Sequence, residues 1–346
     1  MEDGDQSGRI ISRRQSLRIA GLVAVAPLAS PSCNANAVNS GTIKASDFPD
    51  SRPSPQGRVK GTNVHPTPAQ FLGPTSDVWV NFWAGGYDWA YVKESIDRPV
   101  PLGINVVRII GSTNAITDGS IARTRYLANH RQVASYCRSI GIRYYPCAAS
   151  LTHRGAATDS AIINEIVALY QAMIPYGNTI FGFDMYNEYR DDSAGLAHAA
   201  TMVANTAAAI RRIGNNPIPI TASIHTDITN ADLIRAIAPH VDYLDFHLWQ
   251  TLSFMQSNPN LFSFLQLVTP GLKVVVGEMG TNRSDGSSAQ QRADYYTAAR
   301  VIQQNTPQQL GTINWAAIDD NFGLYDYTTR TLQADISGAW ALFPNT

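Results

Sequence analysis

The sequence predicts an α/β fold, a (β/α)8 TIM barrel that occupies residues 58–346 as one domain. Short apolar runs alternate with longer amphipathic stretches throughout this region, which is the pattern of a parallel sheet. There are eight such runs, and a count of eight favours closure into a barrel. An open, doubly wound sheet is the alternative, but a Rossmann sheet needs a Gly-rich phosphate turn after its first strand, and residues 61–66 do not form one.

Each predicted strand is a short run rich in apolar, β-branched or aromatic residues. The eight predicted strands span residues 59–64, 105–110, 143–148, 180–186, 218–224, 243–247, 273–276 and 312–316.

Between these strands, apolar residues recur at helical spacing. After the second, third and fourth strands they run over residues 127–140, 162–173 and 196–210. Gly141 and Gly214 follow two of these stretches at positions where helix C-caps belong. Further helices are predicted at residues 231–238, 261–267, 288–304 and 334–342.

The composition is that of a chain with a large core. Of its 346 residues, 44% are hydrophobic and 15% are charged, with a formal net charge of -1. That balance argues against a nucleic-acid partner, and nothing after the N-terminal segment is apolar enough to span a bilayer. We expect a soluble, monomeric body.

Residues 1–37 resemble a twin-arginine export signal. Arg13 and Arg14 precede an uncharged run over residues 19–29, and residues 35–37 offer a small-residue cleavage site. The resemblance predicts export to the periplasm or the extracellular space. Acylation of Cys33, as in a lipoprotein, is the alternative.

Residues 38–57 are rich in Ser, Pro and Asp without periodicity, which predicts a linker between the signal and the body. Removing the signal leaves Cys137 and Cys147. Two cysteines do not make a disulfide framework for a domain of this size, so we interpret both as buried apolar residues.

Polar and aromatic residues collect where the predicted strands end. A barrel brings the carboxyl ends of its strands onto one rim, and its sites lie there. In chain order these residues are His65, Arg108, His153, Asn187, Glu188, His247, Trp249, Glu278 and Trp315. Either glutamate alone could be a rim residue in a salt bridge, but two at strand ends favour catalysis.

This arrangement resembles the site of clan A glycoside hydrolases, most closely glycoside hydrolase family 5 and its cellulase-like relatives. The resemblance extends from about Val59 to the end of the chain. It implies that Glu188 is the general acid/base and Glu278 the nucleophile in cleavage of a β-linked oligosaccharide or polysaccharide. It further implies that Asn187 donates to the sugar 2-hydroxyl and that Arg108 keeps Glu278 ionised.

The same resemblance assigns substrate binding to the remaining rim residues. Trp315 becomes the platform under the bound sugar, and His65, His153 and His247 match site histidines. The sixth strand departs from the family pattern, because Trp249 stands where a tyrosine usually touches the nucleophile. An indole offers only its N–H there.

Cleavage of a glycosidic bond by double displacement requires residues of these types. Double displacement needs one protonated and one ionised carboxyl, about 5–5.5 Å apart. An adjacent arginine lowers one pKa, while a neighbouring anion and burial raise the other. No cofactor is required.

Two other functions fit parts of the pattern. An exported sugar-binding barrel without turnover is one, and Trp249 favours it. A metal-dependent hydrolase using His65, His153, His247 and a carboxylate is the other. It is disfavoured because the first strand lacks the His-x-His that such barrels commonly use.

Overall fold

The computed structural model describes residues 53–150, 157–188, 196–214, 217–225 and 229–344. The predicted export signal, most of the predicted linker and His153 lie outside these residues.

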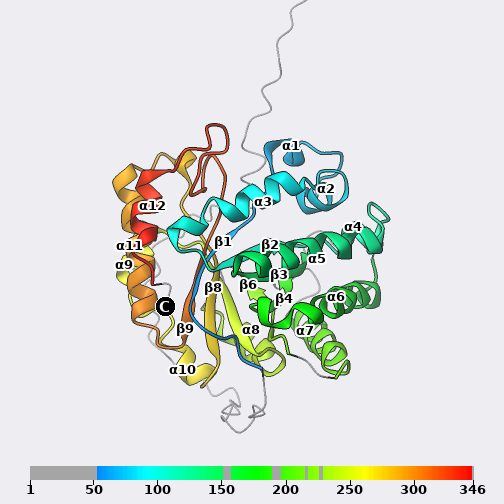
Figure 1. Ribbon diagram of the computed structural model, residues 1–346. Helices are drawn as coiled ribbons and strands as arrows, with labels where there is room; N and C mark the ends of the chain where they lie inside the picture. The colour runs from blue at the N-terminus through cyan, green and yellow to red at the C-terminus, as the bar shows by residue number, and fades with distance from the viewer. Residues whose placement is uncertain (1–52, 151–156, 189–195, 215–216, 226–228, 345–346) are drawn as a thin grey trace, which may run out of the picture. The chain divides into compact units, whose positions relative to one another are not determined.

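The described residues form one parallel sheet with the order β5-β4-β3-β2-β1-β9-β8-β7-β6. Its strands are β1 (Val59–Asn63), β2 (Val106–Ile110), β3 (Arg143–Ser150), β4 (Phe183–Asn187), β5 (Ile220–Thr221), β6 (Ser223–Ile224), β7 (Tyr243–Leu248), β8 (Lys273–Met279) and β9 (Gln309–Asn314). Only Ala222 separates β5, which pairs with β4, from β6, which pairs with β7. These two segments are halves of one barrel strand, so the predicted (β/α)8 TIM barrel is confirmed (Figure 1).

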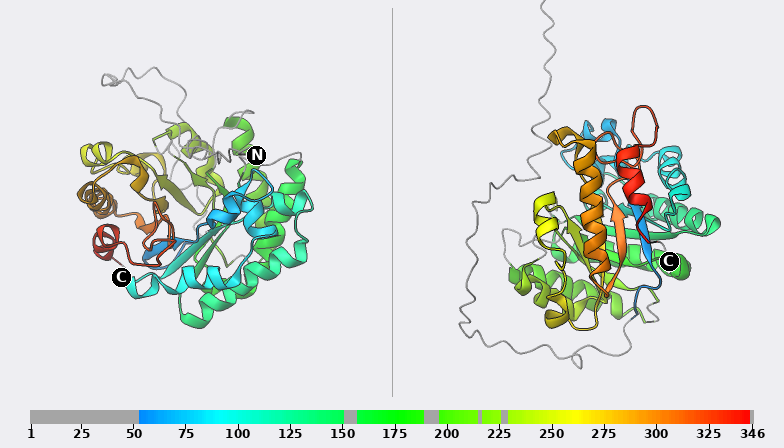
Figure 2. Two further views of the ribbon diagram at one scale, coloured as in Figure 1. Left: turned by 90° about the horizontal axis from the view of Figure 1, so that it is seen from above. Right: turned by 90° about the vertical axis from the view of Figure 1, so that its left-hand side faces the viewer.

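Helices cover the outside of this wall. They are α1 (Pro68–Phe71), α2 (Val78–Ala84), α3 (Trp89–Asp97), α4 (Asn114–Thr117), α5 (Arg123–Ile140), α6 (Asp159–Met173), α7 (Leu196–Arg211), α8 (Ala231–Ile237), α9 (Leu252–Ser257), α10 (Leu265–Val268), α11 (Ala289–Gln304) and α12 (Ala334–Ala341). Helices α5, α6 and α7 lie on one side of the barrel, and α9, α11 and α12 lie on the other (Figures 1 and 2). No helix among the described residues has the length and hydropathy needed to cross a membrane.

Four segments differ from the sequence prediction. The fourth barrel strand begins at Phe183, because a 3-10 helix over Ile174–Thr179 precedes it and Ile180 makes only an isolated bridge. The last strand begins at the buried Gln309 and ends before Trp315. The segment between β1 and β2 contains α1, α2 and α3, and the helix predicted at 261–267 is shorter and later as α10.

Alternation along β2 separates two cores. Val106 points into the barrel, where it joins Tyr145, Phe181 and Tyr243, whereas Val107 belongs to the larger core under the helices. Arg108 follows two residues after Val106 and therefore also points inward. Its guanidinium lies 5.6 Å from the ring centre of Tyr145, so a polar layer rests directly on an aromatic one.

An imidazole is buried between α5 and the barrel wall. His130 stacks on Trp83 at 4.1 Å between ring centroids, and its Nδ1 lies 2.7 Å from the hydroxyl of Tyr144. Trp83 donates its indole N–H to the carbonyl of Ile110 at 2.9 Å. Burial lowers the pKa of His130 to about 3. Trp83 is thus a core residue, and Cys137 and Cys147 are likewise buried with free thiols.

This buried histidine predicts acid sensitivity. An unfolded histidine titrates near pH 6.5, so below that pH the unfolded chain binds a proton that the folded chain does not, and stability falls as the pH falls. Between pH 7 and pH 4 this linkage amounts to about 3 kcal/mol. We therefore expect the wild-type chain to lose about 3 kcal/mol more unfolding free energy over this interval than His130→Phe. Urea denaturation at both pH values measures it, and equal losses would contradict the linkage.

Candidate active site

The site is built on the fully buried side chain of Arg108. Its Nη1 donates to Glu278 Oε1 at 2.5 Å and to Asn63 Oδ1 at 3.1 Å. Its Nη2 donates to Asp184 Oδ2 and to Asn187 Oδ1, both at 2.8 Å. One planar group thus connects β1, β2, β4 and β8, which only an arginine fork can do.

Arg108 also fixes the orientation of Asn187. A guanidinium has donors and no acceptor, so the Asn187 atom that faces it must be the carbonyl oxygen. The amide nitrogen is thereby turned away from Arg108. Asn63 is set in the same way, and its Nδ2 donates to the carbonyl of Gly277 at 3.1 Å. The Asn187 amide therefore presents its N–H groups away from Arg108, whereas the oxygen and the nitrogen of the Asn63 amide are both bonded within the barrel wall.

A third carboxyl group, that of Asp245, lies in the same buried layer as those of Glu278 and Asp184. It accepts from the Tyr145 hydroxyl at 2.5 Å and from the Gly277 N–H at 2.8 Å. A Cβ on Gly277 would come within 2.3 Å of both Asp245 oxygens, so only glycine fits there. Gly277 therefore lets β8 approach β7 at the point where Glu278 enters the site.

Glu188 follows β4 in a left-handed conformation, with φ of 50°. Few residues other than glycine, asparagine and aspartate adopt this region without a supporting contact. Its backbone N–H donates to Ser223 Oγ at 3.1 Å, and Ser223 Oγ in turn donates to the carbonyl of Tyr186 at 3.2 Å. These bonds hold the turn that directs the Glu188 side chain to the barrel axis.

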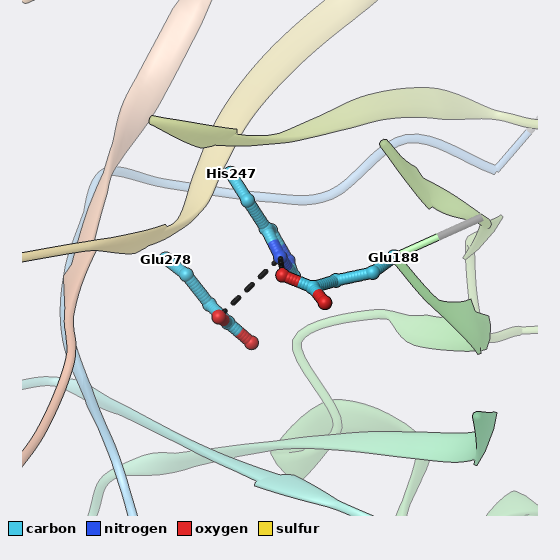
Figure 3. A group of neighbouring side chains, drawn as sticks. All are labelled: Glu188, His247 and Glu278. Atoms are coloured by element: carbon cyan, nitrogen blue, oxygen red, sulfur yellow. Dashed lines mark hydrogen bonds and ion pairs between the residues drawn. The ribbon is translucent and has the colours of Figure 1, made fainter. Parts of the chain in front are cut away.

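The two glutamates meet on one imidazole (Figure 3). His247 Nδ1 lies 3.3 Å from Glu188 Oε1 and 3.4 Å from Glu278 Oε2. One oxygen of each glutamate and this nitrogen all lie within 4.8 Å of one another. A single imidazole nitrogen therefore lies between two carboxyl groups, one partly buried and one buried.

Burial raises the pKa of Glu278 well above its ordinary value. Contact with Arg108 opposes this rise, and the nearby carboxyl of Glu188 adds to it. Two carboxyl groups this close resist carrying two negative charges, which is why the Glu188 carboxyl adds to the rise in the pKa of Glu278.

Sequence reasoning missed one member of the site, His225. Its Nε2 lies 3.2 Å from Glu188 Oε1. His225 follows β6 directly, at the end of the predicted fifth strand. A polar residue at the carboxyl end of a predicted strand is the signal that indicated the other rim residues, and His225 carries the same signal.

Aromatic rings form one wall beside the carboxyl groups. Trp315, beyond β9, lies edge-on to Trp79 at 6.2 Å and to Trp249 at 6.4 Å. Trp249, beyond β7, also lies edge-on to Phe322 at 5.8 Å. At the position where a tyrosine was expected to touch the nucleophile, the chain thus has an indole in the aromatic wall. The contact from β7 to Glu278 comes from His247.

His65 lies at the edge of this wall. Its ring is edge-on to Trp315 at 5.1 Å, and its Nδ1 lies 3.2 Å from Asp319 Oδ2. Asp319 also accepts from the backbone N–H groups of Asn321 and Phe322. The structure thus places His65 beside the platform tryptophan, whereas His153 lies outside the described residues.

The cluster of Glu188, His247 and Glu278 is also the group whose spacing could admit a metal ion. Glu278 already carries the Arg108 guanidinium on its other oxygen, and a cation would stand next to a fixed positive charge. The metal-dependent alternative required His65 together with His247, but His65 is turned to Asp319. The donor set fits acid–base chemistry better than metal ligation.

Comparison with known proteins identifies the class. The family model described as cellulase (glycosyl hydrolase family 5) matches residues 59–321. The fold and its rim residues thus define an O-glycosyl hydrolase of the clan A type. The chain belongs to glycoside hydrolase family 5.

Solved structures share the fold at low sequence identity. An exo-β-1,4-mannosidase from Opitutaceae bacterium strain TAV5 is 16% identical with a TM-score of 0.65, over 87% of this chain and 61% of the other. The chain thus spans about three fifths of that protein. A broad-specificity endoglucanase from an uncultured bovine rumen ciliate is 12% identical with a TM-score of 0.63, over 81% and 94%. A β-glucuronidase from Ruminococcus gnavus is 13% identical with a TM-score of 0.57, over 82% and 50%. Comparison with curated protein sequences gives no match.

The position of Arg108 predicts a large stability effect. Replacing it in Arg108→Met leaves buried carboxylates without their counter-ion, and such a loss costs about 3–5 kcal/mol. The matched control is Arg235→Met, because Arg235 pairs with Asp232 on the surface and the two side chains are 47% and 81% exposed. Exposed pairs contribute about 0–1 kcal/mol. Chemical denaturation compares the two variants, and similar losses would contradict the role of Arg108.

Proposed function

We propose that the chain is a retaining glycosidase that cleaves β-linked oligosaccharides or polysaccharides, with Glu188 as acid/base and Glu278 as nucleophile. The observation that carries this proposal is the spacing of the two carboxyl groups, which place one oxygen each within 4.8 Å on a common imidazole. Retaining enzymes keep their carboxyls about 5–5.5 Å apart, whereas inverting enzymes leave roughly 6.5–9.5 Å for a water molecule.

Arg108 supports the division of roles. The guanidinium contacts Glu278 and opposes the rise in the pKa of Glu278 that burial causes. We therefore place the acid proton on Glu188 and the negative charge on Glu278. Glu188 is also the more exposed of the two, with 16% of its side chain accessible against 4% for Glu278. A leaving group and then a water molecule can reach it from the rim.

In the first step, Glu278 attacks the anomeric carbon and forms the glycosyl–enzyme ester. Glu188 gives its proton to the departing glycosidic oxygen, whose bond to the anomeric carbon breaks. In the second step Glu188 takes a proton from water, and the water oxygen attacks the anomeric carbon. The ester bond breaks and Glu278 is released as an anion.

The neighbouring groups suit a sugar ring. The Asn187 amide, turned by Arg108, presents a donor to the 2-hydroxyl, where hydrogen bonds strengthen in the transition state. Trp315 offers an aromatic surface to the C–H face of the sugar. The neighbours described as an exo-β-1,4-mannosidase and an endoglucanase favour a β-linked mannose or glucose polymer. His65 and Trp249 lie where they could line the same sugar site.

We expect Glu188→Gln to reduce hydrolysis of a β-linked polysaccharide by ~10²–10⁴-fold, the range for a lost general acid/base. Glu278→Gln should nearly abolish it, because no nucleophile remains. Reducing-sugar release on a panel of mannan, cellulose, xylan and galactan measures both. Glu94→Gln is the matched control, since Glu94 pairs with Arg98 and Arg330 outside the site.

Azide separates the two roles. With a 2,4-dinitrophenyl β-glycoside, Glu278→Ala plus azide should yield a glycosyl azide of inverted anomer, and Glu188→Ala plus azide one of retained anomer. Proton NMR of the anomeric position reads both. Wild-type-like hydrolysis in either glutamine variant, or the opposite anomers, would overturn the assignment. Saturable glycan binding without any product from the wild-type chain would favour the sugar-binding alternative.

We also propose that residues 1–37 direct export through the twin-arginine route. The support is the order of arginine pair, uncharged run and small-residue site in the sequence. Replacing Arg13 and Arg14 together with lysine should retain the full-length precursor in the cytoplasm of a bacterial host. Fractionation followed by mass spectrometry of the N-terminus measures this, and unchanged processing of the double variant would contradict it.

A further inference from the structure

His225 is a site residue that takes no part in the two steps of the proposed reaction. It lies at the end of β6, with 15% of its side chain accessible, and its Nε2 is 3.2 Å from Glu188 Oε1. That oxygen is also the one that His247 approaches, at 3.3 Å. Two imidazoles from neighbouring strands therefore converge on one oxygen of one carboxyl group.

Strand register explains the convergence. Ser223 pairs with Asp245 and Ile224 with Phe246 across β6 and β7. The next residue along each strand is a histidine, so His225 and His247 leave the sheet at the same level. Ser223 additionally accepts the Glu188 N–H through its Oγ. The backbone and the side chain of Glu188 are thus both held from β6.

We infer that His225 is a positioning residue for Glu188, donating from Nε2 to Oε1 so that the exchangeable proton of Glu188 is carried on Oε2. This inference rests on the proposed acid/base role of Glu188. An oxygen that accepts from two N–H donors is a poor place for an acidic proton, because that proton would meet the donor hydrogens. His225 and His247 together select which carboxyl oxygen faces the scissile bond and hold it there.

His225 is expected to act on proton transfer and not on sugar binding, so substrates that differ only in their leaving group distinguish the two effects. A 2,4-dinitrophenolate leaves without protonation, so kcat/KM for its glycoside does not need the acid. A phenolate or a sugar leaves poorly and does need it. For both substrates the second step needs the base, so kcat for the dinitrophenyl glycoside reports on deglycosylation.

The test compares His225→Phe with His225→Gln. Phenylalanine fills the volume but has no donor, whereas the glutamine amide retains an N–H within similar reach. With phenyl and 2,4-dinitrophenyl β-mannosides, β-glucosides and β-cellobiosides as probes, we expect His225→Phe to reduce kcat/KM for the phenyl glycoside ~10- to 100-fold, as for a lost hydrogen bond to a charged group. For the dinitrophenyl glycoside kcat/KM should change less than about threefold while kcat falls, and His225→Gln should restore most of both.

Three outcomes overturn the inference. Equal losses of kcat/KM on both leaving groups indicate a general structural role, no loss indicates no role, and failure of His225→Gln to restore either constant excludes a donor. His198→Phe is the matched control, because His198 contacts the Asp159 carboxylate at 3.0 Å between α7 and α6, away from the site. It should leave every constant unchanged.

Glu188→Gln, measured on the same substrates, separates this inference from the proposed function. If Glu188→Gln shows the leaving-group dependence and His225→Phe does not, the inference fails alone. If Glu188→Gln shows no such dependence, or the wild-type chain turns over none of the glycosides, the acid/base assignment fails and the inference fails with it.

Discussion

The buried charge of Arg108 constrains the rest of the barrel mouth. A guanidinium in such a place is stable only when acceptors surround it, and here it receives Glu278, Asp184, Asn187 and Asn63. Each acceptor comes from a strand end or from inside a strand, so the register of four strands is tied to one planar group. The same contact that makes burial tolerable also distinguishes Glu278 from Glu188. The contact between Arg108 and Glu278 thus contributes both to the stability of the fold and to the chemical difference between the two glutamates.

The wall below and beside this group is built to keep it in place. Tyr145 supports the guanidinium from beneath and donates to Asp245, while Gly277 leaves the space that Asp245 occupies. Above it, the strand-end residues change character from buried acceptors to a partly exposed carboxyl and an aromatic wall. The site therefore changes from a buried, hydrogen-bonded floor to a more accessible rim.

Much of this was accessible from the sequence. The apolar runs predicted the strands. Because parallel strands end at one edge of the sheet, the polar residues at those ends predicted a common site containing Arg108, Glu188, His247 and Glu278. What failed had local causes. Gln309 is polar and yet buried, with its amide nitrogen donating to Gly311 and Thr312, so hydropathy alone predicted a start too late for the last strand. His225 was missed, although it directly follows the predicted strand over 218–224 and so carries the same signal as the other strand-end residues. The ring contacts of Trp249 could not be inferred, because they depend on three-dimensional neighbours such as Phe322.

The fifth barrel strand is divided at Ala222 into β5 and β6, and this division is the seam at which the sheet closes. Glu188 follows β4, the neighbour of β5, and Glu278 lies on β8, two strands from β6. Pairing through the continuous part of the sheet connects the two glutamates only by the long way around, through β3, β2, β1 and β9. Across the seam they are joined by Ser223, His225 and His247. Contacts made by the side chains of Ser223, His225 and His247 therefore bridge the two glutamates where no strand pairing connects them directly.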